Sequence, residues 1–336
     1  MARPRLLSQL QHIEITSSDV EATTKFFVDV LGLEESARDD GSVYLRCWGE
    51  WFHNSVIISE GEGPSLVHVG WRAYGPDELQ QLAATLEAQG VGEGWVDSSV
   101  GHGPAYRFRV PGGGINEVFW EVDRYKAPEH LRSTFPNRPQ KYLGRGVACR
   151  QLDHITMPTK DLREDVKWWE QTLGLRFMEY AVLDEDRSHM FFAEMSTNEQ
   201  AHDLGLLNDS GWVPGRIHHL AFWLDQNVDV MRAADTLLEN GAELEYGPGR
   251  HGHGENTFLY FREPGGMRVE LFSGGYRNYQ PDWQPIEWLP SQGSLDMTRA
   301  QIAPDSMLDA FPLAKTDERI KVGDEFENPW ALEGVH

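Results

Sequence analysis

The sequence predicts an α+β protein of two tandem domains, each made of two βαβββ units, so that four units form mixed sheets curved around a site. Two observations carry this prediction. The chain repeats itself at long range, and each repeat alternates strand-like with helix-like stretches. A chain of 336 residues is also long enough for two domains with a sizeable core.

The opening half of the repeat has the same spacing in both copies. His12 and His154 each lie in an alternating apolar run, 19 positions before a Leu-Gly-Leu turn. Such a run predicts a strand, and the aspartates that follow it, Asp19 and Asp161, are good helix N-caps. The glycine of the Leu-Gly-Leu turn suits the left-handed position at a helix end. Short apolar runs after the turn predict the remaining strands of the unit.

The closing half of the repeat agrees as well. His68 and His219 each open a strand and helix that end at a glycine 22 positions later. A Pro-Gly-Gly turn then leads to Glu117 or Glu270, six positions after its proline in both copies. Several spacings that agree together are hard to obtain by chance, so we expect a duplicated architecture.

Composition excludes several classes of partner. The net charge of −23 repels nucleic acid and anionic membranes. The only two cysteines, Cys47 and Cys149, form no CxxC pattern, which argues against a disulfide framework or a thiolate metal site. The N-terminal residues lack the sustained apolar stretch of a signal peptide, and no run approaches eighteen apolar residues. We therefore expect a cytoplasmic protein.

Three polar residues on predicted strands form the candidate metal site. The symmetry of the units should bring His154, His219 and Glu270 to one concave sheet. Two imidazoles and one carboxylate on a single face leave open positions on a divalent metal, as in non-heme Fe(II) oxygenases. The alternative is structural, since any one of the 13 histidines is more often a surface or core residue. His218 and His219 also face opposite ways, so only one can face the metal.

The stretch from Gly249 to Glu270 carries a family resemblance. Its Gly-Pro-Gly-Arg-His251-Gly run and its Tyr260 to Glu270 segment resemble the signature of the type I extradiol ring-cleavage dioxygenases, within the vicinal oxygen chelate superfamily. The branch it resembles most contains the homoprotocatechuate 2,3-dioxygenases and catechol 2,3-dioxygenases. The resemblance covers most of residues 8–290.

The resemblance implies an activity and a set of roles. It implies extradiol cleavage of a catechol by O2 at one Fe(II), with Mn(II) as an alternative, in a homo-oligomer that is a tetramer. The implied metal ligands are His154, His219 and Glu270. His202 matches the acid–base histidine, and His251 and Tyr260 match residues that hydrogen-bond the substrate oxygen. Without the resemblance, His202 would be taken for a loop histidine and Tyr260 for a core tyrosine.

The resemblance also gives the domains their roles. The predicted boundaries are 1–123 for a non-catalytic N-terminal domain, 124–148 for a linker, 149–275 for the catalytic domain and 276–336 for a tail that covers the body.

The chain departs from the homoprotocatechuate pattern at substrate-pocket positions. Tyr246 and Ser291 stand where that branch has arginines that grip a substrate carboxylate, Glu194 replaces a pocket tryptophan, and Thr156 replaces an asparagine. Loss of the cationic grip predicts a neutral substrate: catechol, an alkylcatechol or 2,3-dihydroxybiphenyl. An arginine from the tail, Arg277 or Arg299, would restore the grip and is the alternative.

The N-terminal repeat keeps the same three ligand types, His12, His68 and Glu117, so a second metal is an open alternative. The positions that match Tyr260 and His251 are Arg107 and Ser98, however, and no histidine matches His202. We therefore expect a relic of the duplication. The competing functions for the whole chain are a glyoxalase-type isomerase, a keto-acid dioxygenase, or a drug-sequestering protein of the same fold.

Overall fold

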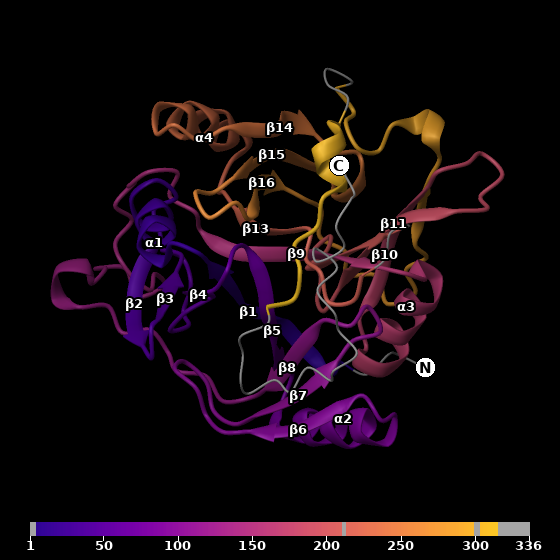
Figure 1. Ribbon diagram of the computed structural model, residues 1–336, viewed down its shortest axis with the longest axis horizontal. Helices are drawn as coiled ribbons and strands as arrows, with labels where there is room; N and C mark the ends of the chain where they lie inside the picture. Colours follow the sequence, from indigo (N-terminus) through magenta and orange to yellow (C-terminus); the bar gives the residue numbers. More distant parts are fainter. Residues whose placement is uncertain (1–4, 210–212, 299–302, 315–336) are drawn as a thin grey trace.

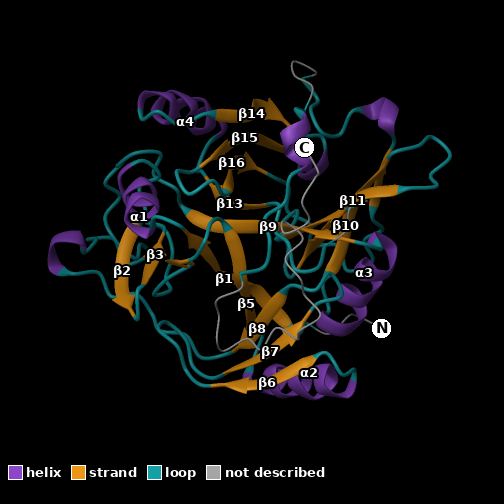
Figure 2. Ribbon diagram, in the orientation of Figure 1, coloured by secondary structure: helices purple, strands orange, loops and turns teal. Residues whose placement is uncertain are grey.

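A computed structural model describes residues 5–209, 213–298 and 303–314 of the chain. It contains two mixed sheets with helices on their outer sides (Figures 1 and 2). No helix in these ranges is long and apolar enough to cross a membrane. The predicted α+β fold of four βαβββ units is confirmed, and the units follow one another along the chain.

The first sheet has the strand order β2-β3-β4-β1-β5-β8-β7-β6. Its two units comprise β1 (Leu7–Ser17), α1 (Val20–Asp29), β2 (Glu34–Asp39), β3 (Ser42–Arg46) and β4 (Val56–Glu60), then β5 (Ser65–Ala73), α2 (Pro76–Ala88), β6 (Gly92–Val96), β7 (Ala105–Arg109) and β8 (Ile115–Phe119).

The second sheet has the order β14-β15-β16-β13-β9-β12-β11-β10-β17. Its units comprise β9 (Gln151–Thr159), α3 (Leu162–Trp168), β10 (Arg176–Val182), β11 (Met190–Ser196) and β12 (Leu204–Asn208), then β13 (His219–Trp223), α4 (Asn227–Glu239), β14 (Leu244–Arg250), β15 (Asn256–Arg262) and β16 (Arg268–Gly274). A short strand, β17 (Ile286–Trp288), pairs with β10.

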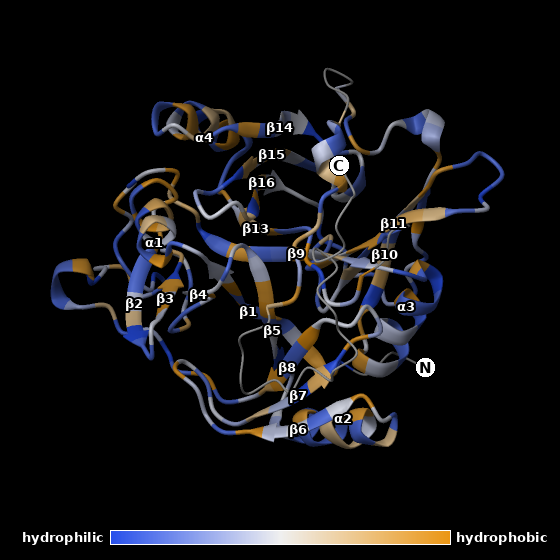
Figure 3. Cartoon of the chain, viewed as in Figure 1, coloured by the Kyte–Doolittle hydropathy of each residue, from blue (hydrophilic) through white to orange (hydrophobic). Residues whose placement is uncertain are grey.

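The predicted helix ends have the expected chemistry. The side chain of Asp19 accepts a hydrogen bond from the Ala22 backbone N–H at 2.9 Å, and that of Asp161 accepts from Glu164 at 3.2 Å. Gly174 closes the turn after α3 in the left-handed region, with φ of 77°. Helices α2 and α4 show apolar residues alternating with polar ones (Figure 3), and their apolar faces are buried.

The two sheets repeat each other in register as well as in order. In each, one cross-strand row joins equivalent positions of four neighbouring strands. The rows are Arg107–Glu117–Gly70–His12 and Tyr260–Glu270–Ala221–His154. Because side chains alternate along a strand, residues of one row share a face of the sheet. The repeat found by spacing therefore places each histidine and glutamate on the same face.

The predicted tail pairs with both halves of the chain. Besides supplying β17, it bridges Phe311 to Ile217 of the second half and Leu313 to Leu66 of the first. Residues 315–336, the last part of the predicted tail, and Arg299 lie outside the described residues. The domain boundaries themselves stay a prediction.

A buried carboxylate joins the two halves. Glu50, between β3 and β4, accepts hydrogen bonds from the backbone N–H of Leu152 at 2.8 Å, the backbone N–H of Cys47 at 2.7 Å and the hydroxyl of Ser55 at 2.7 Å. Leu152 belongs to β9, so this one side chain links the first sheet to the strand that carries His154.

We expect Glu50→Ala to lower the free energy of unfolding by about 2–4 kcal/mol, because it leaves buried donors without an acceptor. Urea unfolding followed by circular dichroism measures the change. Glu50→Gln is the matched control, since its amide oxygen still accepts, and it should lose less than half as much. Equal losses in the two variants would show that these hydrogen bonds do not carry the effect.

Candidate metal centre

Three neighbouring strands bring the predicted ligands together. His154 lies on β9, His219 begins β13 and Glu270 lies on β16. The Nε2 atoms of His154 and His219 are 3.0 and 3.1 Å from Oε2 of Glu270, and 3.3 Å from each other. These atoms form a group that could hold a metal ion.

The buried carboxylate and imidazoles of this cluster favour the binding of a cation. All three side chains are buried, and Oε1 of Glu270 has no hydrogen-bond partner within the described residues. Burial alone would lower the pKa of His154, but hydrogen bonds to Asp153 and Glu270 raise it to about 10. Burial would raise the pKa of Glu270, but the two imidazoles hold it well below its usual range. A divalent metal fits this donor set and would take the place of the proton.

Further groups fix the orientation of the imidazoles. Nδ1 of His154 lies 3.0 Å from Oδ2 of Asp153, and Nδ1 of His219 lies 2.6 Å from Nδ1 of His218. The other ring nitrogen of His218 donates to the carbonyl of Met307 at 2.6 Å. Such outer contacts select the tautomer and leave Nε2 free for a metal. His218 thus holds the ring of His219 in place.

A cavity of about 340 Å³ opens at the cluster, and His202, His251 and Tyr260 line it. His251 Nε2 lies 3.2 Å from the hydroxyl of Tyr260, and the ring of His202 is 4.2 Å from that of His154. Burial lowers the pKa of His251 to about 3 and that of His202 well below its usual range. Burial and the carboxylate of Glu270 raise the pKa of Tyr260. His202 and His251 therefore offer neutral imidazoles, and Tyr260 offers a protonated phenol.

The three predicted substrate-pocket residues are placed differently. Thr156 and Tyr246 line the cavity, and the ring of Tyr246 stacks on that of Tyr260 at 6.1 Å. Glu194, which we predicted to line it too, is fully buried and does not. Glu194 lies against His202 instead: Nδ1 of His202 is 3.3 Å from Oε1 of Glu194.

His218 lines this cavity together with His219, although the sequence predicts that the two face opposite ways. Sequence reasoning also missed one further histidine of the cavity. His253 lines it, two positions after His251, and its Nδ1 lies 2.7 Å from Oε1 of Glu194. The second histidine of the His251-Gly-His253 run was the available signal. Its partner lies 59 positions away, and spacing alone does not connect the two.

Comparisons with known proteins agree with this geometry. The model of the glyoxalase/bleomycin resistance protein/dioxygenase superfamily matches residues 9–109 and 151–271. The manganese-dependent 2,3-dihydroxybiphenyl 1,2-dioxygenase of Geobacillus genomosp. 3 is 36% identical, over 84% of this chain and 90% of its own. The metapyrocatechase of Geobacillus stearothermophilus is 35% identical, over 84% and 86%.

The chain belongs to the extradiol dioxygenases of this superfamily. A solved relative, the homoprotocatechuate 2,3-dioxygenase from Arthrobacter globiformis, has a TM-score of 0.81 and 25% identity, covering 93% of this chain and 94% of its own. The family predicted from the Gly249–Glu270 stretch is therefore confirmed.

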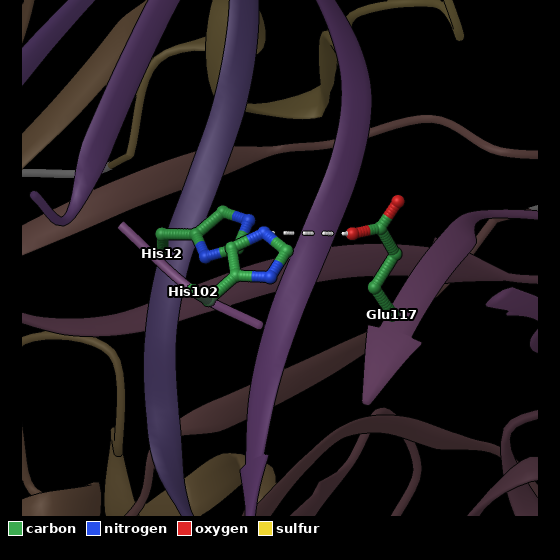
Figure 4. A group of neighbouring side chains, drawn as sticks. All are labelled: His12, His102 and Glu117. Carbon is green, nitrogen blue, oxygen red and sulfur yellow. Dashed lines mark ion pairs between the residues drawn. The ribbon is translucent and has the colours of Figure 1, made fainter. Parts of the chain in front are cut away.

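The N-terminal half of this dioxygenase holds a second cluster, which includes a histidine that the sequence did not predict there. His12, His102 and Glu117 come together there (Figure 4), and His102 is the histidine that the sequence did not predict. His102 comes from the loop between β6 and β7 and its ring stacks on that of His12 at 5.3 Å. The predicted His68 lies beside them, because its Nε2 is 2.9 Å from Nε2 of His12 and 3.8 Å from Oε2 of Glu117.

An arginine supplies the positive charge in this second cluster. Arg107 donates from Nε to Oε1 of Glu117 at 2.8 Å, and its Nη2 bonds the same oxygen. Burial would raise the pKa of Glu117, but His68 and Arg107 lower it to about 2. Arg107 holds the register position of Tyr260, so the carboxylate that faces a phenol in one half faces a guanidinium in the other.

We expect the purified protein to bind one equivalent of Fe(II) or Mn(II) per chain. His154→Ala should weaken binding by roughly 100-fold or more, because it removes a ligand, whereas the matched variant His12→Ala should keep the full equivalent. Anaerobic titration with metal analysis measures both. Two equivalents in the wild type, with one lost in His12→Ala, would contradict the assignment.

Metal binding should also release about one proton at pH 7. The raised pKa of His154, about 10, means that the metal-free protein holds a proton there, and the metal competes for it. Affinity should therefore rise by up to about tenfold per pH unit between pH 6 and 9. Titration against a pH indicator in weak buffer measures the release, and an affinity independent of pH would contradict it.

Proposed function

We propose that this protein opens the ring of a neutral catechol beside its two hydroxyl groups, using O2 and one Fe(II) held by His154, His219 and Glu270. Mn(II) is the alternative metal. The observation that carries the proposal is the convergence of these three ligands at a cavity that His202, His251 and Tyr260 also line. The names of relatives support both metals, since one is manganese-dependent and another is an iron-dependent extradiol dioxygenase.

The chain's own residues then act on the substrate. A bound metal would supply Lewis acidity for the catechol hydroxyls and open positions for catechol and O2. His202, neutral because its pKa is lowered, can accept a hydroxyl proton and return it later. Tyr260 can donate a hydrogen bond to a developing negative oxygen once its proton turns away from Nε2 of His251, which lies 3.2 Å from the hydroxyl.

The walls of the cavity support a neutral, apolar substrate. They include Phe191, Phe192, Leu207 and, from the tail, Leu295 and Met307. No lysine or arginine occurs among the described residues that line it, so nothing in this part of the chain would grip a carboxylate. Arg277, one alternative we had considered, borders a different and smaller cavity. A relative that acts by name on 2,3-dihydroxybiphenyl supports an aryl-substituted catechol.

Three broader expectations belong to the proposal. We propose a cytoplasmic protein, a homotetramer, and a division of labour in which residues 149–275 are catalytic and residues 1–123 are not. Light scattering of the purified protein tests the tetramer, and a mass near one or two chains would contradict it.

We expect the Fe(II)-loaded protein to turn catechol and O2 into a yellow ring-opened product. Its kcat/KM should be at least about tenfold higher for catechol or 2,3-dihydroxybiphenyl than for homoprotocatechuate, because the carboxylate would lose hydration without gaining a cationic partner. Stopped-flow absorbance measures each substrate. A preference for homoprotocatechuate would overturn the neutral-substrate proposal, and no colour with any catechol would overturn the activity.

A further inference from the structure

A buried carboxylate stands behind two of the cavity histidines. Glu194 lies on β11 and is fully buried. Its Oε1 is 2.7 Å from Nδ1 of His253 and 3.3 Å from Nδ1 of His202. This carboxylate oxygen therefore hydrogen-bonds His253 and lies within ion-pair distance of His202, whose Nδ1 has no hydrogen bond within the described residues.

The second ring nitrogen of His253 lacks a hydrogen-bond partner within the described residues. Its Nε2 is buried and has no hydrogen-bond partner there, although the residue lines the cavity. Its ring stacks on that of His251 at 4.4 Å and packs against Phe192 at 4.9 Å, so the side chain is held in place. A buried polar nitrogen without a partner is unfavourable, and a ligand in the cavity can supply that partner.

The surroundings of His253 place it near the reacting centre. His251, on which it stacks, reaches to 3.9 Å from Oε1 of Glu270. His202, which shares Glu194 with it, packs against His154. His253 is thus flanked by two residues that themselves touch the metal cluster.

We propose that His253 is a further substrate-contacting residue, which hydrogen-bonds an oxygen of the bound catechol through Nε2, and that Glu194 is the positioning residue for both His253 and His202. The identity of the ligand rests on the proposed function. The anchor rests on the geometry of the side chains alone.

The first test is the anaerobic Kd of catechol for the Fe(II)-loaded protein, read from the ligand-dependent absorbance change. His253→Phe keeps an aromatic ring but loses the hydrogen bond, so Kd should rise roughly 3- to 10-fold with unchanged metal content. His253→Val, a smaller apolar variant, should show the same rise. A wild-type Kd in either folded, metal-loaded variant would overturn the contact.

The second test separates positioning from general structure. Glu194→Leu should raise Kd and also lower kcat by about tenfold or more, since His202 loses its anchor. Glu194→Gln keeps an acceptor oxygen and should restore most of both. In the double variant Glu194→Leu/His253→Phe, Kd should be no higher than in Glu194→Leu alone, because the two residues act as a unit. Additive effects, or no rescue by glutamine, would contradict the positioning role.

Another buried carboxylate provides a control variant. Glu263→Gln alters another buried carboxylate, which accepts from Thr23 and does not line the cavity, and should leave Kd unchanged. Long-range ¹H–¹⁵N spectra of histidine-labelled protein should show altered tautomers for His202 and His253 in Glu194→Leu without any ligand. Unaltered tautomers overturn the anchor. A wild type that binds no catechol overturns the proposed function, and with it the substrate contact.

Discussion

A carboxylate buried in the middle of a sheet has to be balanced by positive charge, and both halves of the protein are arranged around that requirement. In the C-terminal half, Glu270 faces two imidazoles, and one of its oxygens receives no hydrogen bond from the described residues. In the N-terminal half, Glu117 occupies the equivalent register position and is paired with Arg107. In the N-terminal half the guanidinium of Arg107 therefore balances the buried carboxylate, as we propose that a metal ion does in the C-terminal half.

The rest of the fold keeps this charged cluster dry and correctly oriented. Three adjacent strands set the ligand positions, so their separation follows from strand spacing rather than from loops. Asp153 and His218 fix the tautomers, and the tail carbonyl of Met307 fixes His218 in turn. The same tail lines the cavity, so the segment that excludes water also shapes the substrate site.

Much of the fold and of the metal site could be predicted from the sequence, because the residues that define them recur at regular spacings. The repeated spacings placed the strands and the rows of His154 and Glu270, and the aspartates marked the helix starts. What the sequence did not reveal depends on contacts between distant side chains. His102 reaches Glu117 from a loop, and Glu194 lies against His202 and His253 rather than lining the pocket. The strand β17 escaped notice because a three-residue strand leaves no periodic signal.

The central claim is that one metal ion binds at the C-terminal cluster and none at its N-terminal counterpart. Anomalous diffraction at the iron absorption edge, from crystals grown anaerobically with Fe(II), tests it most directly. The account predicts a single strong peak per chain within bonding distance of His154 Nε2, His219 Nε2 and a carboxylate oxygen of Glu270. A peak at His12, His102 and Glu117, or no peak at the C-terminal cluster, would contradict it.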